Sequence, residues 1–253
     1  TAINVNPALA NLLIQRGITS YDGAKSFFRP TLKMLHDPFL MKDMEHAVHR
    51  LQLAMERQEK ILIYGDYDVD GTTSVALAYG FLSSIYDHIE YYIPDRYKEG
   101  YGISEEGIRY ASENGFSLII SLDCGIRAVG LVNEARQQNI DFIICDHHRP
   151  GEQLPPAHAI LNPKQKGCSY PFKELCGCGV GFKLLHGLSV STKKYKKELA
   201  SWLDLVAVAI AADIVPITGE NRIMSYFGLI QLNESLRPGL KALANLAGLR
   251  GEI

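Results

Sequence analysis

The sequence predicts an α/β fold: a mostly parallel five-stranded sheet with helices on both faces, preceded by N-terminal helices and followed by a helical segment. The main observation is that short apolar runs alternate with longer helical segments from residue 61 onward. This alternation favours parallel strands joined by right-handed crossovers. The predicted strands cover residues 61–64, 89–93, 118–122, 142–145 and 159–161.

The N-terminal part, residues 1–58, is predicted to be a helical extension. Its apolar residues recur at near-helical spacings, and Pro30 and Pro38 indicate a loop between its helices. No group of candidate catalytic residues occurs before residue 61. We therefore expect the functional site in the next predicted domain, residues 59–222.

Helical segments between the first four strands are long enough to serve as crossovers, at residues 73–86, 104–114 and 128–138. A Pro-rich loop at residues 154–156 precedes a part that is helical from about residue 176. The last predicted segment, residues 223–253, consists of a helix, a turn at Pro238 and Gly239, and a second helix. We expect it to begin a connector that leads to a second domain.

The composition is that of an ordinary globular protein, with 47% hydrophobic and 21% charged residues. No apolar run approaches the roughly 18–20 residues of a membrane span, and no secretion signal is recognisable. The five cysteines form no zinc-binding pattern and should remain thiols in a reducing compartment. We therefore expect a soluble, cytoplasmic protein that does not associate with membranes.

The formal net charge of −2 argues against a protein that coats nucleic acid through a large basic excess. It does not exclude a nuclease. Clustered acids hold divalent cations, and these cations neutralise both the acids and an incoming phosphate.

Three aspartates stand at alternate positions directly after the first predicted strand: Asp66, Asp68 and Asp70. Carboxylates gathered at a strand end repel one another unless cations occupy the site. Gly71 then allows the chain to turn, and we expect the hydroxyls of residues 72–73 to cap the next helix.

The same string resembles the start of a calcium-binding EF-hand loop. That loop requires a glutamate at its twelfth position, and if Asp66 is the first position the twelfth is Leu77. The apolar residues around Leu77 are typical of a buried helix, which argues against an EF-hand. A solvated acidic turn remains the other alternative for this motif taken alone.

Two further polar groups follow the third and fourth predicted strands: Asp123, and the triplet Asp146, His147 and His148. Taken singly, such an aspartate usually caps a helix and such a histidine usually has a structural role. Ligands of parallel sheets, however, bind beyond the carboxyl ends of the strands. Three acidic groups that follow three parallel strands should therefore converge at one edge.

A fourth acidic group, Asp213, ends the apolar helix predicted at residues 203–212. An unpaired charge emerging from an apolar run must find a partner, because its burial is very costly. A position facing solvent is a poor alternative, since acids are disfavoured at the negative end of a helix. A cation at the sheet edge would supply the partner.

Several carboxylates and a histidine from separate segments suit manganese or magnesium better than zinc. Two such ions can lower the pKa of a bridging water and hold the oxygens of an attacked phosphoryl group. Phosphate-ester hydrolysis is the reaction that this pattern favours.

At these residues the sequence resembles the DHH phosphoesterase superfamily, which is named for the triplet at residues 146–148. The string ILIYGDYDVDGTTS at residues 61–74 resembles the first motif of RecJ-type single-strand exonucleases. The likeness extends over essentially the whole chain. Its other motifs are LHDPF (35–39), PDR (94–96), EGYG (99–102), SLDCG (121–125), LNP (161–163), CGVGFK (178–183) and ADIVP (212–216).

The resemblance implies a set of ligands for two divalent cations, Mn²⁺ or Mg²⁺, with Asp123 as the bridging ligand. This set comprises Asp68, Asp70, Asp123, His147 and Asp213.

Supporting roles are also implied. Asp66 would bind a metal or support one, and Asp146 would orient His147. His148 would contact the scissile phosphate. Arg96 would hold a substrate phosphate through its fixed fork of donors.

Two points stay open. Many DHH enzymes have a metal-ligating histidine four residues before Asp68, where this sequence has Tyr64. Arg96 has an alternative role as a surface arginine paired with Glu99 or Asp95.

The function implied by the resemblance is that of a metal-dependent 5′-to-3′ exonuclease on single-stranded DNA in recombination and repair. A helicase or a single-strand-binding protein would be candidate partners. One alternative is a DHH phosphodiesterase that acts on short oligonucleotides or cyclic dinucleotides. The other is a non-catalytic replication scaffold of the Cdc45 type, against which the full set of acids and histidine weighs.

Overall fold

The computed structural model describes residues 5–249 and 251. The ends of the predicted first and last segments, at residues 1–4, 250 and 252–253, lie outside the described residues. The chain divides into two compact units, Thr1–Leu35 and His36–Ile253. Within the described residues, no helix combines the length and the apolar character needed to cross a membrane.

The first unit contains only the earlier part of the predicted N-terminal extension, since the helix at residues 44–56 belongs to the second unit. Helix α1 (Pro7–Gln15) begins with a proline, and the side chain of Asn6 accepts a hydrogen bond from the N–H of Ala8 at 2.9 Å. Helix α2 (Tyr21–Phe28) is capped in the same way by Ser20. A short 3₁₀ helix, η1 (Leu32–Met34), follows.

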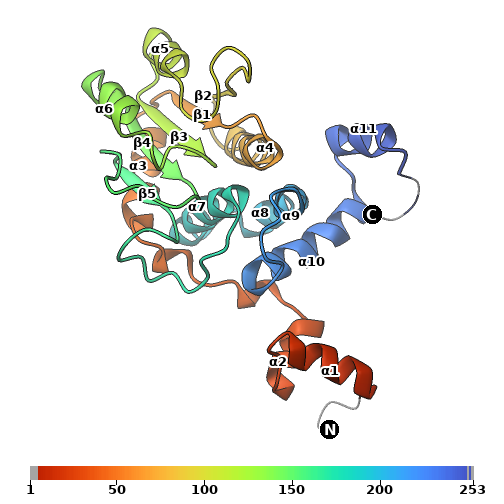
Figure 1. The fold of residues 1–253 in the computed structure, drawn as a ribbon. Coiled ribbons are helices and arrows are strands. Elements are labelled where there is room, and N and C mark those ends of the chain that lie inside the picture. The colour runs from red at the N-terminus through yellow and green to blue at the C-terminus, as the bar shows by residue number, and fades with distance from the viewer. Residues whose placement is uncertain (1–4, 250, 252–253) are drawn as a thin grey trace. The chain divides into compact units, whose positions relative to one another are not determined.

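The second unit is built on the predicted sheet, whose five strands are all parallel and lie in the order β2-β1-β3-β4-β5 (Figure 1). This confirms the predicted fold class. The strands are β1 (Ile61–Gly65), β2 (Ile89–Tyr92), β3 (Leu118–Leu122), β4 (Asp141–Cys145) and β5 (Ala159–Leu161).

The register of the three middle strands aligns their carboxyl ends. The last residues of β1, β3 and β4 pair with one another, Gly65 with Leu122 and Leu122 with Cys145. Asp66, Asp123 and Asp146 are the next residues along the chain. The strand order and the register therefore deliver all three to one edge of the sheet.

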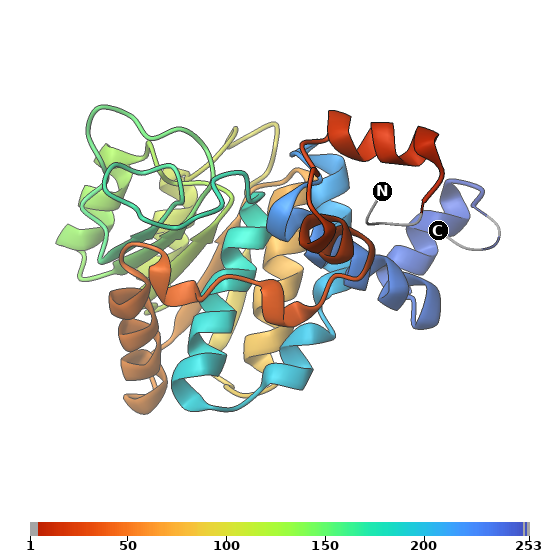
Figure 2. The same cartoon turned by 90° about the horizontal axis from the view of Figure 1, so that it is seen from below.

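Helices cover both faces of the sheet. Helices α5 (Glu105–Glu113) and α6 (Val129–Gln137) cover one face. On the other face, α3 (Met44–Glu56) packs against β5, α4 (Val69–Ser83) against β1 and β2, and α7 (Gly177–Thr192) against β3 and β4 (Figures 1 and 2). The sheet is thus buried between two helical layers.

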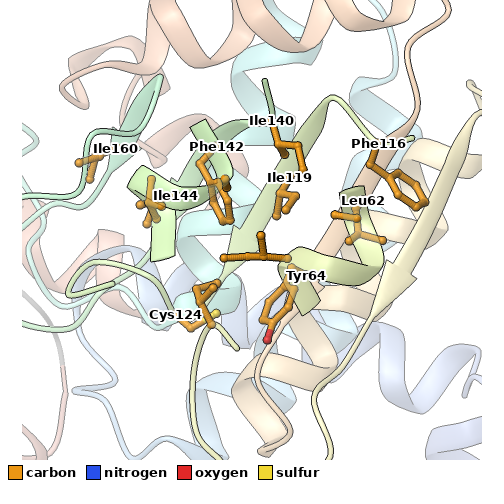
Figure 3. Close-up of a cluster of buried hydrophobic side chains, with 14 of the residues drawn as sticks. Leu62, Tyr64, Phe116, Ile119, Cys124, Ile140, Phe142, Ile144 and Ile160 are labelled. Carbon is orange, nitrogen blue, oxygen red and sulfur yellow. The ribbon is translucent and has the colours of Figure 1, made fainter. Parts of the chain in front are cut away.

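A core cluster forms between the sheet and helices α5 and α6 (Figure 3). Alternate strand residues contribute to it, because successive side chains of a strand point to opposite faces. Leu62 and Tyr64 come from β1, and Ile119 comes from β3. The residues between them, such as Ile63 and Ile120, are equally buried and face the other helical layer.

The remaining helices continue from α7. Helix α8 (Lys196–Ala200) is short, and α9 (Leu203–Ala212) packs against α4 and α7. Helix α10 (Gly219–Glu234) packs against α9. Helix α11 (Pro238–Leu246) begins at Pro238, so the turn lies at residues 235–237 and its predicted position, at Pro238 and Gly239, is wrong. Proline suits the first position of a helix, where its missing N–H is not needed. The chain also contains a 3₁₀ helix, η2 (Pro38–Leu40). The predicted domain limits after residues 58 and 222 stay predictions.

The structure corrects the start of the first crossover helix. Helix α4 begins at Val69 because Asp68 Oδ1 accepts a hydrogen bond from the N–H of Gly71 at 2.8 Å. The hydroxyls of Thr72 and Thr73, the expected caps, instead donate to carbonyl oxygens of the preceding turn. The last of the three aspartates therefore lies in the first turn of the helix.

Candidate metal centre

The predicted acids converge on His147. Its Nε2 atom lies 3.2 Å from Asp123 Oδ1, 3.6 Å from Asp213 Oδ2 and 3.9 Å from Asp70 Oδ2. Two overlapping groups of side chains could each hold a metal ion, Asp123 with His147 and His148, and Asp70 with His147 and Asp213. Both groups contain His147, so they overlap at the sheet edge.

Asp123 occupies the most constrained position of the site. Its backbone is left-handed, with φ of 60°, and its side chain is buried. A Cβ atom on Gly177 would lie 2.4 Å from Asp123 Oδ1, so only glycine fits at the start of α7. The same oxygen has no hydrogen-bond partner within the described part of the chain.

Asp70 is held by the N-terminus of α7. Its Oδ2 accepts a hydrogen bond from the N–H of Gly177 at 2.6 Å, and its Oδ1 accepts one from the N–H of Cys178 at 2.7 Å. Free N–H groups and the helix dipole make this end of a helix favourable for a negative charge. Helix α7 therefore fixes the orientation of the Asp70 carboxylate next to His147.

The structure corrects the expected partner of Asp146. We expected Asp146 to orient His147, but its Oδ1 is 2.8 Å from Nδ1 of His148 and also accepts the N–H of His148. Its Oδ2 accepts the N–H of Ile126. The adjacent ring cannot reach the same carboxylate, because Nε2 of His147 points to the other acids. Asp146 thus orients His148, and Nδ1 of His147 has no described hydrogen-bond partner.

Asp213 joins the site from the C-terminal end of α9, where it is the C-cap residue. Its side chain is 30% exposed, and its carboxylate faces His147. The next residue, Ile214, has a left-handed backbone with φ of 56°, which is unfavourable for a β-branched side chain.

Asp66 and Asp68 lie outside both groups of candidate ligands in the described structure. Asp66 is buried, and its two oxygens accept hydrogen bonds from the N–H groups of Tyr67 at 2.7 Å and Gly102 at 2.9 Å. Asp68 is exposed and caps α4. Their roles as metal ligands stay predictions.

The electrostatics of the site suit a cation. Burial raises the pKa of Asp123, and the charges of Asp70 and Asp68 raise it further. Burial likewise raises the pKa of Asp70, although the N–H groups of α7 oppose the shift. For His147, burial lowers the pKa, so the ring favours the neutral form that binds metals.

The residues present fit a pair of hard divalent cations. They offer carboxylate oxygens and an imidazole nitrogen, the donors that Mn²⁺ and Mg²⁺ accept. A buried carboxylate oxygen without a donor is costly, and the Asp123 oxygen is such an atom. A cation would satisfy this oxygen and relieve the repulsion among the acids.

His148 is the more exposed of the two histidines, with 41% of its side chain accessible. Its hydrogen bond to Asp146 raises its pKa, despite the opposing effect of burial. For Asp146, burial raises the pKa, but the hydrogen bonds from His148 and Ile126 together with the charge of His148 outweigh this effect, and the net shift is downward. His148 therefore retains a proton more readily than His147.

A row of rings leads from the surface to His148. The Arg96 guanidinium lies over the Tyr67 ring at 5.2 Å, and the Tyr67 and Tyr101 rings meet edge to face at 6.0 Å. The Tyr101 hydroxyl lies 3.4 Å from Nε2 of His148. None of the described ion pairs contains Arg96, and its role stays a prediction.

Sequence reasoning missed two contributors to the site. Tyr101 lies within the EGYG motif, and the glycines on both sides of it are the signal that indicates an exposed, tightly turned loop. Gly177 and its neighbour Cys178 were not assigned to Asp70, because a contact between residues so far apart leaves no local signal. The glycine-rich string that opens α7 was the available clue.

Comparison with known proteins shows the family of the chain. The model of the DHH family, N-terminal domain, matches residues 60–210, which is more than half of the chain. This chain belongs to the DHH family.

Two relatives of the chain are named as exonucleases. The chain is 45% identical to the single-stranded-DNA-specific exonuclease RecJ of Bacillus subtilis, over 97% of this chain and 30% of that protein. It is 36% identical to the RecJ exonuclease of Escherichia coli, over 95% of this chain and 43% of that protein. The chain therefore spans less than half the length of these relatives.

The fold matches a solved DHH-family structure. A crystal structure of RecJ from Thermus thermophilus in complex with Mn²⁺ superposes with a TM-score of 0.81 and 28% identity. The match covers 99% of this chain and 35% of that one.

Proposed function

We propose that this chain carries the metal centre of an exonuclease that hydrolyses phosphodiester bonds in single-stranded DNA from the 5′ end. The observation that carries the proposal is the convergence of Asp70, Asp123 and Asp213 on His147. The similarity to RecJ exonucleases supports the choice of substrate.

Two divalent cations, Mn²⁺ or Mg²⁺, are the proposed cofactors, and a related structure contains Mn²⁺. When bound, they would supply positive charge to the attacked phosphate and lower the pKa of a water molecule. The proposed ligands are Asp68, Asp70, Asp123, His147 and Asp213, with Asp123 shared between the ions.

His148 is proposed to contact the scissile phosphate. Asp146 holds its Nδ1 at 2.8 Å, which leaves Nε2 free to donate a hydrogen bond toward a substrate oxygen. The upward pKa shift that Asp146 causes keeps this donor protonated to a higher pH. The Tyr101 hydroxyl lies 3.4 Å from Nε2, so the surface proposed for the rest of the strand begins next to this contact.

Arg96 and the two tyrosine rings are proposed to receive the DNA strand. Successive bases of a single strand stack on exposed aromatic rings, and an arginine beside them binds phosphate. Tyr101 is 55% exposed, so its ring is available for such contacts. This arrangement favours a single strand over a duplex, whose bases are already stacked.

A cytoplasmic role in recombination and repair, with a helicase or a single-strand-binding protein as partner, is part of the same proposal. The net charge of −2 supports dependence on a partner, because little long-range attraction holds a polyanion to this chain. Activity of the chain alone should therefore fall steeply as salt is raised.

The test compares three substrates in the presence of Mn²⁺: a single strand labelled at its 5′ end, the same strand in a duplex, and a dinucleotide. We expect release of labelled mononucleotide from the single strand only. Preference for the dinucleotide would instead indicate a phosphodiesterase of short substrates. Binding of the single strand without any hydrolysis would indicate a scaffold.

A further inference from the structure

The loop between β2 and α5, residues 93–104, is fastened by a carboxylate from within the loop. Glu99 Oε2 accepts hydrogen bonds from the Tyr92 hydroxyl at 2.8 Å and from Ser104 Oγ at 2.6 Å. Its Oε1 accepts the N–H of Asp95 at 2.7 Å. One side chain thus joins both ends of the loop.

Tyr64 holds the same loop from the sheet. Its ring is buried in the core cluster (Figure 3). The ring also stacks on that of Tyr92, with the centroids 5.4 Å apart. Its hydroxyl donates to the carbonyl oxygen of Gly102 at 2.9 Å and accepts the N–H of Ser104 at 3.1 Å. A Cβ atom on Gly107 would lie 2.5 Å from the ring, so α5 leaves the tyrosine no freedom to move.

These contacts act on Tyr101. Gly100 and Gly102 on either side of it have φ of 82° and 87°, conformations that leave the loop free to adopt other shapes unless it is anchored. Gly102 is anchored twice, by its carbonyl to Tyr64 and by its N–H to Asp66. The Tyr101 hydroxyl is thereby kept within 3.4 Å of His148.

We propose that Tyr64 and Glu99 are positioning residues that hold the 93–104 loop so that Tyr101 and Arg96 face an incoming DNA strand. The inference rests on the proposed function of the metal centre. It also gives a role to the tyrosine that stands where many DHH enzymes have a metal-ligating histidine. The Tyr64 side chain points to α5, on the opposite side of the sheet from α4 and α7, and binds the loop instead of a metal.

The proposal separates two kinds of substrate. A small diester such as bis(p-nitrophenyl) phosphate contacts only the metal centre and His148, whereas a DNA strand also contacts the loop. Loosening the loop should therefore weaken the use of a strand and leave the small diester unaffected. A change that merely harmed the fold would reduce both.

The variants are Tyr64→Phe and Glu99→Gln, which keep the shape of each side chain. The matched control is Tyr110→Phe, because Tyr110 lies on α5 and its hydroxyl binds Glu90 outside the loop. We expect Tyr64→Phe and Glu99→Gln to raise KM for a 5′-labelled single strand by roughly 10-fold, since each leaves loop groups without partners. In both variants, hydrolysis of bis(p-nitrophenyl) phosphate and affinity for Mn²⁺ should stay within about twofold of the wild type. The control variant should change none of the three quantities.

A second readout does not depend on activity. Trypsin cleaves after arginine and lysine, and Arg96 and Lys98 are both exposed in this loop. Cleavage there should be faster in Tyr64→Phe and Glu99→Gln than in Tyr110→Phe. Unchanged cleavage together with an unchanged KM would overturn the inference, as would an equal loss of activity on both substrates. If the wild-type chain hydrolyses neither substrate, the proposed function is wrong. Faster cleavage of the two variants would in that case still support the anchoring of the loop.

Discussion

Two buried charged clusters of the second unit differ in how their charges are balanced. In one, Lys183 Nζ lies 2.6 Å from Glu220 Oε1 and donates to the carbonyl of His36, while Tyr170 donates to the other oxygen of Glu220. Every charge there has a partner within the chain. In the other, Asp123 lies among further acids, and its Oδ1 has no hydrogen-bond partner among the described residues.

The difference separates a structural cluster from a site built for a ligand. A buried ion pair with additional hydrogen bonds is complete in itself. A group of acids around a histidine that favours its neutral form is not complete, because the negative charges require a counter-charge from outside the chain. Acidity alone therefore does not identify the metal centre; the missing counter-charge does.

The largest effect is expected for Asp123→Asn, which keeps the shape of the residue and suits a left-handed backbone. Removing the shared ligand should lower metal-dependent hydrolysis by at least about 100-fold, more than the roughly 10–100-fold caused by losing a residue that supports a ligand. Stability of the metal-free chain should not fall, because the variant removes an unpaired buried carboxylate. Activity assays with Mn²⁺ and urea unfolding without it measure the two quantities. A variant that keeps its activity would refute the assignment.

The opposite pattern is expected for Glu220→Gln. This change leaves Lys183 buried without its counter-charge, and breaking a buried pair in this way costs about 3–5 kcal/mol. Urea unfolding should show the loss equally with and without Mn²⁺. Glu234→Gln, an exposed position on the same helix, is the control. A loss of less than about 1 kcal/mol would show that this cluster is not a structural support.

A smaller effect concerns pH. Burial, together with the charge of Lys183, lowers the pKa of His186 to about 4. His186 therefore binds a proton more readily in the unfolded chain than in the folded one. Its contribution to the free energy of unfolding is fully present above about pH 6.5 and is lost as the pH drops toward 4, by at most about 3 kcal/mol. His186→Leu should flatten this part of the curve, and the same change at exposed His88 should not. Identical slopes in all three proteins would contradict the assignment.

The smallest effect is expected at Ile214, which is 87% exposed and left-handed. Asparagine adopts that conformation more easily, so Ile214→Asn should stabilise the chain by up to about 1 kcal/mol. Ile217→Asn serves as the control, because Ile217 is also exposed but is not among the described residues with positive φ. An equal response of the two variants to urea would show that the backbone at Ile214 stores no strain.

The sequence predicted the sheet because its strands are short apolar runs, such as residues 118–122, that are separated by crossover-length helices. It also predicted that Asp123 and Asp146 would lie at one edge, since parallel strands end together. Both are consequences of local patterns and simple topology.

Other features of the site depend on contacts that no local pattern records. Asp70 is oriented by Gly177 N–H, a residue 107 positions later in the chain. Asp146 binds His148 rather than its nearer neighbour, because the choice depends on where each ring points once the loop has folded. Tyr64 shares its motif with proposed metal ligands, yet strand alternation turns its side chain to the face that α5 covers.

The central claim is that the cluster around His147 holds two divalent cations. Isothermal titration calorimetry of Mn²⁺ into the wild-type chain, Asp123→Asn and Glu220→Gln tests it most directly. We predict two bound ions in the wild type, loss of at least one in Asp123→Asn, and two in Glu220→Gln under conditions where that variant is folded. Two ions bound with undiminished affinity by folded Asp123→Asn would contradict the claim.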